Sequence, residues 1–306
     1  EIRALEDGAL VRTLTLSGTP DASNPVRAIS ADGAHVGVVW GERLDLFDLD
    51  GTRQLEPAYL AANTIPVDVY LDGQHAHVLV VGDSPQVVTF PMEPWGGGRD
   101  WNPAGAVIND GGICSDGRYL YATYSTAASD YALALLDFSG PLSVTVLDTY
   151  TWSTTGNPQP RGITCDGEFV YVATNDSGAR GVRVFRVIRD TITPSHSLEL
   201  VTDLNIGAIP RSVAVAPGLL MVTSSAGEAT LYLYHVPSFE LLGEVAIEEA
   251  DPGENDVCTD GLFAYTPGSS NALTRTHLAG RVRRWRRCDG TEAYRRPFHN
   301  LLIPGD

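Results

Sequence analysis

Lysine is absent from this 306-residue chain, so all 21 of its basic side chains are arginine. Against 38 acidic residues, the arginines leave a formal net charge of −17. Nucleic-acid binding depends on a basic surface, so this balance argues against a general nucleic-acid-binding protein. Two explanations of the missing lysine stay open: a GC-rich genome that favours arginine codons, and adaptation to salt.

Positive charge is scarce except in one segment near the C-terminus. Seven arginines fall between Arg281 and Arg296, in RVRRWRRCDGTEAYRR. A basic patch that contains an aromatic residue can bind phosphate or RNA. We favour a half-exposed outer strand, whose charge complements the acidic N-terminus at Glu1, Glu6 and Asp7.

Long apolar runs are also missing. No run approaches the roughly 18 residues that a bilayer-crossing helix needs, so we predict no membrane span. The chain begins at Glu1 rather than Met and carries no signal peptide, which suggests a processed form. We expect an exported protein, in the periplasm or outside the cell.

Recognisable catalytic motifs are lacking, and we predict no catalytic residue. The sequence contains no G-x-S-x-G elbow, HExxH motif, P-loop or dinucleotide-binding fingerprint. His75 and His77 alternate along an expected strand and therefore share a face, as two metal ligands would. Since no carboxylate stands out beside them, we favour a solvent-facing strand surface.

The four cysteines show no zinc-site spacing. Cys114, Cys165, Cys258 and Cys288 form neither a CxxC motif nor a cluster with histidine. Cys258 and Cys288 could meet across neighbouring strands in an exported protein. Buried thiols are the equal alternative, so the sequence leaves the pairing open.

What the chain does contain is a repeat. Six times, a β-prone run, a tight turn and a second run rich in Val, Tyr and Phe follow one another, about 46 residues apart on average. The turns lie at Asp32-Gly33, Asp72-Gly73, Asp116-Gly117, Asp166-Gly167, Pro217-Gly218 and Asp260-Gly261. Asp-Gly between apolar runs is a strong hairpin signal, because both residues tolerate positive φ.

A second hairpin follows the first in each repeat. It is clearest in residues 43–57, 182–201 and 231–247. Two hairpins per repeat make a four-stranded antiparallel blade, and helical periodicity is nearly absent. The pattern predicts an all-β fold: a β-propeller that occupies residues 1–306 as a single domain.

The two ends decide the number of blades. Residues 2–18 look like the second hairpin of a blade whose first hairpin is missing, and the tail, 289–305, is long enough to supply it. We therefore favour seven blades, with six as the alternative. In the seven-bladed ring, N- and C-terminal strands close the circle by hydrogen bonding to each other.

Two of the repeats resemble a known family. Residues 160–187, PRGITCDGEFVYVATNDSGARGVRVFRV, and residues 210–236 are similar to YVTN-type and related bacterial propeller repeats. The other repeats depart from the pattern: Asn175, for example, has no counterpart in the segment from Tyr121 to Tyr124. The resemblance implies the propeller fold. That broad group includes extracellular binding proteins and, more distantly, lactonases, so it implies little about activity.

Propellers bind ligands where loops lead into the innermost strand of each blade. Six charged residues lie at these positions, and we predict that they form a ligand-binding ring: Arg27, Asp68, Asp110, Arg161, Arg211 and Asp256. Arginine forks would hold a carboxylate or phosphate, and the aspartates would hold a cation such as Ca²⁺. The alternative is that these side chains pair between blades and stiffen the channel.

A second candidate site is the glycine-rich insertion at residues 92–105. Its Trp95 and Trp101 could stack on a sugar ring or anchor a protein partner. The alternative is that both rings fold back onto a blade edge. Trp152 poses the same choice.

These features favour a non-enzymatic, exported binding or scaffold protein that holds a protein, small-molecule or glycan ligand on a propeller face. We predict no required cofactor, although Ca²⁺ fits the aspartates. The alternative is a divalent-metal-dependent hydrolase or lactonase at the channel mouth. Asp68, Asp110, Asn255 and Asp256 would supply part of its metal site, and Glu254 is the one convincing glutamate. A sugar-binding lectin is a third possibility.

Overall fold

The computed structural model consists of strands and turns in the part of the chain that it describes. That part is residues 2–3, 10–12, 14–20, 25–32, 34–48, 58–60, 63–82, 85–92, 98–103, 111–125, 130–138, 144–153, 160–175, 180–189, 196–224, 229–247, 257–259, 263–267, 273–278 and 301–302. None of these residues belongs to a helix long and apolar enough to cross a membrane.

The chain divides into two compact units. The first is Glu1–Ser153 with Arg189–Ser197, and the second is Thr154–Ile188 with Leu198–Asp306. The single domain expected over residues 1–306 stays a prediction.

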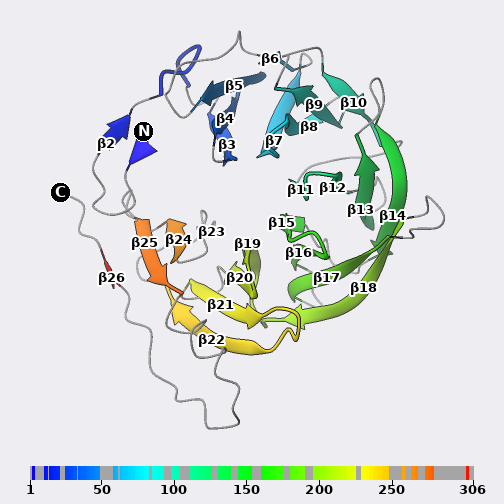
Figure 1. The fold of residues 1–306 in the computed structure, drawn as a ribbon, viewed down its shortest axis with the longest axis vertical. Coiled ribbons are helices and arrows are strands. Elements are labelled where there is room, and N and C mark those ends of the chain that lie inside the picture. The colour runs from blue at the N-terminus through cyan, green and yellow to red at the C-terminus, as the bar shows by residue number, and fades with distance from the viewer. Residues whose placement is uncertain are drawn as a thin grey trace. The chain divides into compact units, whose positions relative to one another are not determined.

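The first unit contains a two-stranded sheet and three four-stranded sheets (Figure 1). The small sheet pairs β1 (Ile2–Arg3) with β2 (Leu10–Arg12). The three larger sheets are antiparallel and follow chain order: β3 (Val26–Ala31), β4 (His35–Trp40), β5 (Arg43–Asp48) and β6 (Ala58–Tyr59); β7 (Thr64–Leu71), β8 (His75–Gly82), β9 (Gln86–Pro91) and β10 (Arg99–Trp101); β11 (Ile113–Ser115), β12 (Tyr119–Ser125), β13 (Asp130–Asp137) and β14 (Thr145–Ser153).

The second unit contains three further four-stranded sheets, each in chain order. Their strands are β15 (Pro160–Cys165), β16 (Phe169–Asn175), β17 (Arg180–Arg189) and β18 (His196–Asn205); β19 (Pro210–Ala216), β20 (Leu219–Ser224), β21 (Thr230–His235) and β22 (Leu241–Ala246); β23 (Cys258–Thr259), β24 (Phe263–Pro267), β25 (Leu273–His277) and β26 (Leu301–Leu302). The bounds of β17 and β18 reach a few residues into the first unit.

The hairpins expected from the repeat are confirmed. The first two strands of each four-stranded sheet flank one of the predicted turns, and the second hairpins predicted at 182–201 and 231–247 correspond to β17–β18 and β21–β22. The one predicted at 43–57 differs, because β5 pairs with β6 at residues 58–59, just after the predicted range. The first strands of neighbouring sheets also lie side by side. In the first unit β3 contacts β7 and β7 contacts β11, and in the second unit β15 contacts β19 and β19 contacts β23.

The turn chemistry differs from the expected one. In the turns at Asp72, Asp116 and Asp166, glycine is the first central residue and alone takes a positive φ, which is +88° at Gly73 and +92° at Gly167. This is the arrangement of a type II′ turn rather than of a type I′ turn with two positive φ angles. In the turn at Pro217, glycine is instead the second central residue. Each aspartate follows the preceding strand directly, and its carboxylate caps the turn.

The hydrophobic core lies between successive sheets. Val78 and Val80 of β8 pack toward the sheet of β3–β6, whereas Leu79 and Val81 of the same strand pack toward the sheet of β11–β14. Successive side chains of a strand point to opposite faces, so a central strand that is covered on both faces must be apolar throughout. Each of these aliphatic side chains contributes about 1.5–3 kcal/mol through burial.

The blade count requires a correction. Five sheets are full blades, whereas the sixth begins and ends on two-residue strands, β23 and β26. Within the described residues the structure therefore shows five full blades, rather than the seven or six expected. The tail at 289–305 was assigned to a seventh blade, but its Leu301–Leu302 pairs with β25 and becomes the outer strand of the sixth sheet. The spacing of the turns predicts how many hairpins form. It does not predict which sheet a strand near the end of the chain pairs with.

The N-terminal hairpin forms a sheet of its own, as β1 pairs with β2. Ring closure by N- and C-terminal strands stays a prediction. The arginine cluster at 281–296 lies outside the described residues.

Candidate functional site

Four tight turns share one polar arrangement, built on the aspartate that precedes the glycine. In the turn after β7, Oδ1 of Asp72 accepts hydrogen bonds from the backbone N–H groups of Gln74 (2.9 Å) and His75 (2.7 Å). The same pair of bonds recurs at Asp32, Asp116 and Asp166. Aspartate is suited to this position because its short side chain reaches the backbone two and three residues onward.

The second carboxylate oxygen of each aspartate binds a side chain from the following strand. Tyr121 and Tyr171, each five residues after their aspartate, donate hydroxyl bonds of 2.9 and 2.7 Å to Oδ2 of Asp116 and Asp166. Burial, together with the neighbouring carboxylate of Asp166, raises the pKa of Tyr171 well above its usual range. Asp116 is half-buried, so its carboxylate needs such donors to offset lost hydration, whereas Asp166 is exposed and water can also reach it.

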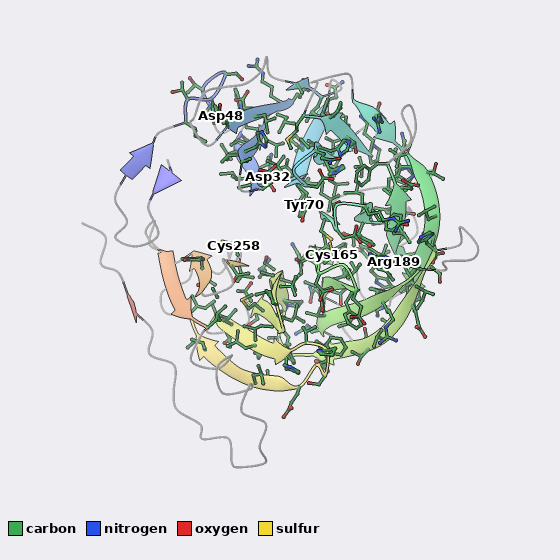
Figure 2. The ribbon with its side chains drawn as sticks, in the orientation of Figure 1. Asp32, Asp48, Tyr70, Cys165, Arg189 and Cys258 are labelled. Atoms are coloured by element: carbon green, nitrogen blue, oxygen red, sulfur yellow. The ribbon has the colours of Figure 1, made fainter. Side chains whose placement is uncertain are left out.

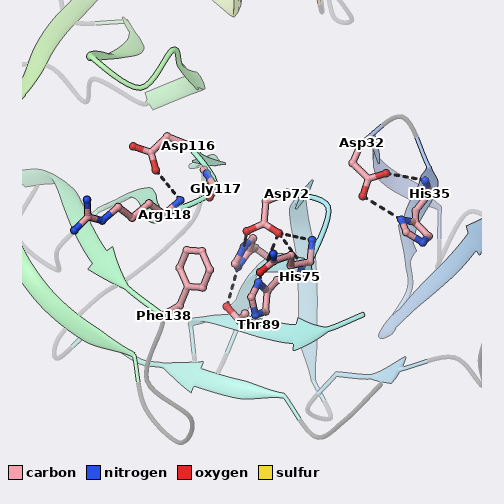
Figure 3. A network of polar contacts seen from close by, with 12 residues as sticks. Asp32, His35, Asp72, His75, Thr89, Asp116, Gly117, Arg118 and Phe138 are labelled. Atoms are coloured by element: carbon pink, nitrogen blue, oxygen red, sulfur yellow. Dashed lines mark hydrogen bonds and ion pairs between the residues drawn. The ribbon is translucent and has the colours of Figure 1, made fainter. Parts of the chain in front are cut away.

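In the first two sheets, histidine replaces tyrosine (Figure 3). Nδ1 of His35 lies 3.1 Å from Oδ2 of Asp32, and Nε2 of His77 lies 3.1 Å from Oδ2 of Asp72. His75 adds a second imidazole at the Asp72 turn, with its Nδ1 3.6 Å from Oδ1. Asp72, His75 and His77 therefore form a three-residue cluster on one hairpin.

This cluster corrects our interpretation of the two histidines. They do share a face, but that face is not exposed to solvent: His77 is fully buried and the His75 side chain is only 16% exposed. The carboxylate that seemed missing is Asp72, which is brought beside them by the turn. Phe138 packs edge-on against both rings, at centroid distances of 5.0 and 4.7 Å.

Electrostatics in the cluster favour a neutral imidazole beside an ionised carboxylate. Burial lowers the pKa of His77, and this outweighs the opposing effect of Asp72. Burial alone would raise the pKa of Asp72, but the adjacent imidazoles of His75 and His77 hold this pKa well below its usual range. On its far side, Nδ1 of His77 lies 2.9 Å from Oγ1 of Thr89, which fixes the ring orientation.

The residues predicted to form a charged ring lie near the starts of first strands. Arg27 on β3 is exposed, whereas Asp68 on β7, Arg161 on β15 and Arg211 on β19 are half-buried. Arg27 and Asp68 belong to the first unit, and Arg161 and Arg211 to the second. Asp110 and Asp256 lie outside the described residues, as does Glu254.

A β-bulge marks the same place in four first strands. The register between β3 and β4 shifts between Val26 and Ala28, so that Arg27 is the extra residue. Equivalent shifts make Val67, Arg161 and Arg211 the extra residues of β7, β15 and β19. A bulge places two residues opposite one and redirects the side chain at that point.

Asp68 is part of the connection between two sheets. Its Oδ1 accepts the N–H of Val69 (2.8 Å), and its Oδ2 accepts the N–H of Ile113 at the start of β11 (2.9 Å). This resembles the alternative in which the charged residues stiffen the fold. With both carboxylate oxygens engaged, Asp68 is a weak candidate for the calcium ligand of a channel-mouth hydrolase.

Two of the tryptophans considered as ligand-binding residues are described, and both are buried. Trp101 is on β10, only 9% exposed, and its ring meets Tyr124 edge-on at 5.6 Å. Trp152 is also buried, and it stacks on Tyr131. Both positions match the alternative of packing onto a blade. Trp95 lies outside the described residues.

The cysteines are dispersed. Cys114 is buried on β11, Cys165 is half-buried on β15, and Cys258 is exposed on β23 (Figure 2). Cys288 lies outside the described residues, so its pairing with Cys258 stays a prediction.

The fold is similar to solved β-propellers. The β-propeller domain of Cps50 (Swd1) from Myceliophteria thermophila superposes with a TM-score of 0.63 at 12% identity, over 86% of this chain and 85% of that one. A chain of the mitotic checkpoint complex gives 0.60 at 14%, over 88% and 86%. A functionally unknown protein from Desulfotomaculum acetoxidans gives 0.57 at 16%, over 83% of each chain.

Likeness at such low identity shows the fold alone. No protein family and no curated protein matches the sequence, so the resemblance to YVTN-type repeats holds only at the level of the propeller. The chain has a β-propeller fold, and its function has to be argued from its own residues.

Proposed function

We propose that this chain is a non-enzymatic binding or scaffold propeller that holds a protein partner at the start of β3, in its first unit. The observation that carries the proposal is the β-bulge that makes the exposed Arg27 the extra residue of this strand. Arginine is enriched in protein interfaces, where its planar fork binds carboxylates.

In the first unit, Arg27 lies among exposed apolar side chains. Val26 and Ile29 of β3 are 42% and 64% exposed, and Ile65 on the neighbouring β7 is 44% exposed. We call these four residues the β3 surface. Apolar side chains around an arginine suit an interface with an apolar centre and one charge-assisted bond. The partner that this surface fits is a protein segment with an acidic residue beside apolar ones.

The similar solved structures support this proposal at the level of the fold, since one of them is a chain of a multi-protein assembly, the mitotic checkpoint complex. Export of the protein stays part of the proposal. Small-molecule or glycan binding at Trp101 is not included, because its ring is buried.

The test compares two double variants of the full chain. Arg27→Glu/Ile29→Glu alters the β3 surface, and Arg180→Glu/Leu241→Glu is the matched control, because it makes the same changes at exposed positions of β17 and β22. Proteins retained by the wild-type chain are identified by quantitative affinity purification, and a purified partner is then titrated. The β3-surface variant is expected to bind at least tenfold more weakly, which corresponds to about 1.4 kcal/mol, with the control unchanged. Equal loss in both variants, or in neither, would contradict the proposal.

A further inference from the structure

The turn between β7 and β8 gathers three metal-ligating side chains that play no part in the proposed partner binding. The donor atoms are a carboxylate oxygen of Asp72, Nδ1 of His75 and Nε2 of His77, and all three lie within 4.8 Å of one another. Two imidazoles and a carboxylate are a common ligand set for zinc, which typically leaves a fourth position for water.

The separations suit a shared ion. Zinc lies about 2.0–2.2 Å from nitrogen and oxygen ligands, so neighbouring ligands of a tetrahedral site are separated by about 3.3–3.6 Å. Nε2 of His77 is 3.1 Å from Oδ2 of Asp72, and Nδ1 of His75 is 3.6 Å from Oδ1. The two distances end on different oxygens of the same carboxylate, and all three ligand atoms lie within 4.8 Å of one another, so the groups need to draw only slightly closer around a bound ion.

His75 supplies the observation that a hydrogen-bonded turn does not explain. Its Nδ1 is buried and has no hydrogen-bond partner, although it faces the Asp72 carboxylate. Leaving a buried nitrogen without a partner is unfavourable, so such atoms need an explanation. A metal ion between this nitrogen and the carboxylate provides one.

The remaining contacts orient the ligands. His77 uses its Nδ1 to reach Oγ1 of Thr89 at 2.9 Å, which leaves Nε2 directed at Asp72. A hydrogen bond on the far nitrogen is the usual support of a metal-bound histidine. Phe138 covers both rings and restricts water, and its backbone carbonyl is held by Arg99 at 2.7 Å.

The other turns show what is specific to this one. The carboxylates of Asp116 and Asp166 accept hydrogen bonds from tyrosine hydroxyl groups, which always carry a proton to donate. Asp32 has a single histidine, His35, because Gly37 occupies the position that corresponds to His77. Within the described residues, two imidazoles meet one of these carboxylates only at Asp72.

We propose that Asp72, His75 and His77 bind one divalent transition-metal ion of the zinc class and so clamp the β7–β8 turn. Imidazole nitrogens favour zinc and its neighbours over Ca²⁺ and Mg²⁺, which prefer oxygen ligands. All three ligands belong to the β7–β8 hairpin.

The experiment titrates Zn²⁺ into the full chain by calorimetry after removal of metals with a chelator. Wild-type protein is expected to bind one Zn²⁺ per chain. His75→Gln is expected to weaken this binding at least tenfold. The matched control, His35→Gln, changes the corresponding residue of the β3–β4 turn and is expected to bind as wild type does.

Co²⁺ loading identifies the ligands independently. Nitrogen and oxygen ligation gives visible ligand-field bands, whereas cysteine ligation adds strong sulfur charge-transfer absorption in the near ultraviolet. His77→Gln tests the buried ligand, and if that variant fails to fold, His75→Gln still decides the outcome. The proposal is overturned if the wild type binds no stoichiometric Zn²⁺, if His75→Gln binds it equally well, or if the Co²⁺ spectrum shows thiolate ligands.

Discussion

The hydroxyl of Tyr171 donates a 2.7 Å hydrogen bond to the carboxylate of Asp166, five residues earlier in the chain. Tyr121 makes the same bond to Asp116 at 2.9 Å, but there Arg189 also donates to the carboxylate, at 2.6 Å. One carboxylate thus relies on the tyrosine more heavily than the other.

Tyr171→Phe should destabilise the protein by about 0.5–1.5 kcal/mol, because the fully buried tyrosine loses a hydrogen bond while water can still reach the exposed Asp166. Tyr121→Phe should cost less, because Arg189 still satisfies Asp116. Urea unfolding of both variants measures the difference. An equal or larger loss in Tyr121→Phe would show that Arg189 does not compensate.

Two glycines, one in a turn and one in a strand, should lose different amounts of stability when replaced by alanine. At Gly73 an added Cβ meets nothing within 4 Å, so Gly73→Ala should cost only the backbone strain of its φ of +88°, about 1–2 kcal/mol. At Gly181 on β17 the added Cβ would collide with the backbone carbonyl of Leu204. Gly181→Ala should cost more, about 3 kcal/mol. Thermal unfolding of the two variants checks this order, and a reversed order would contradict it.

Stability should fall at high pH. Burial, with smaller effects of Tyr232 and Glu244, raises the pKa of Tyr234 from 10.0 to about 12. The unfolded chain loses the tyrosine proton at lower pH than the folded one, so this stabilisation is complete below pH 10 and is lost as pH rises toward 12.

Tyr124 and Tyr171 have pKa values shifted in the same direction and add to the alkaline loss. Tyr234→Phe should therefore make the free energy of unfolding fall less steeply with rising pH, but part of the fall should remain. Chemical unfolding at a series of pH values from neutral to alkaline measures both chains, and identical slopes would rule out the contribution of Tyr234.

Trp101 should matter for stability rather than for binding a sugar. Its ring is buried against Tyr124, so Trp101→Ala should destabilise the protein by about 3–5 kcal/mol. Trp101→Phe keeps an aromatic ring there and should cost less. Unfolding midpoints and a glycan array are measured together. A stable Trp101→Ala variant that loses glycan binding would restore the lectin hypothesis.

Much of the fold could be predicted because its signals are local. The Asp-Gly or Pro-Gly turn and the flanking apolar runs appear within 15 residues, and the hairpins formed where these signals lie. The blade count could not be predicted in the same way. It depends on which edge a two-residue strand such as Leu301–Leu302 joins, and that is decided by pairing with β25, far away in the sequence.

The candidate site shows the same division. Alternation along β8 correctly predicts that His75 and His77 share a face. It does not distinguish a buried face from a solvent-exposed one. Burial came from Phe138, a residue more than 60 positions away. Asp72 does not stand out as a ligand in the sequence, because the Asp-Gly signal places it at the centre of the turn. The spacing Asp-x-x-His-x-His was the available signal.

The bulge in β3, β7, β15 and β19 leaves one residue of each strand without a partner in the strand pairing, while the residues on either side of it stay paired with the adjacent strand. Val67 packs against the core at this point, whereas Arg27 is exposed to solvent. Substitution at position 27 is therefore expected to change the chemistry of the surface while the register of the strands is kept. A new binding preference could arise there by evolution or by design at little cost to the fold.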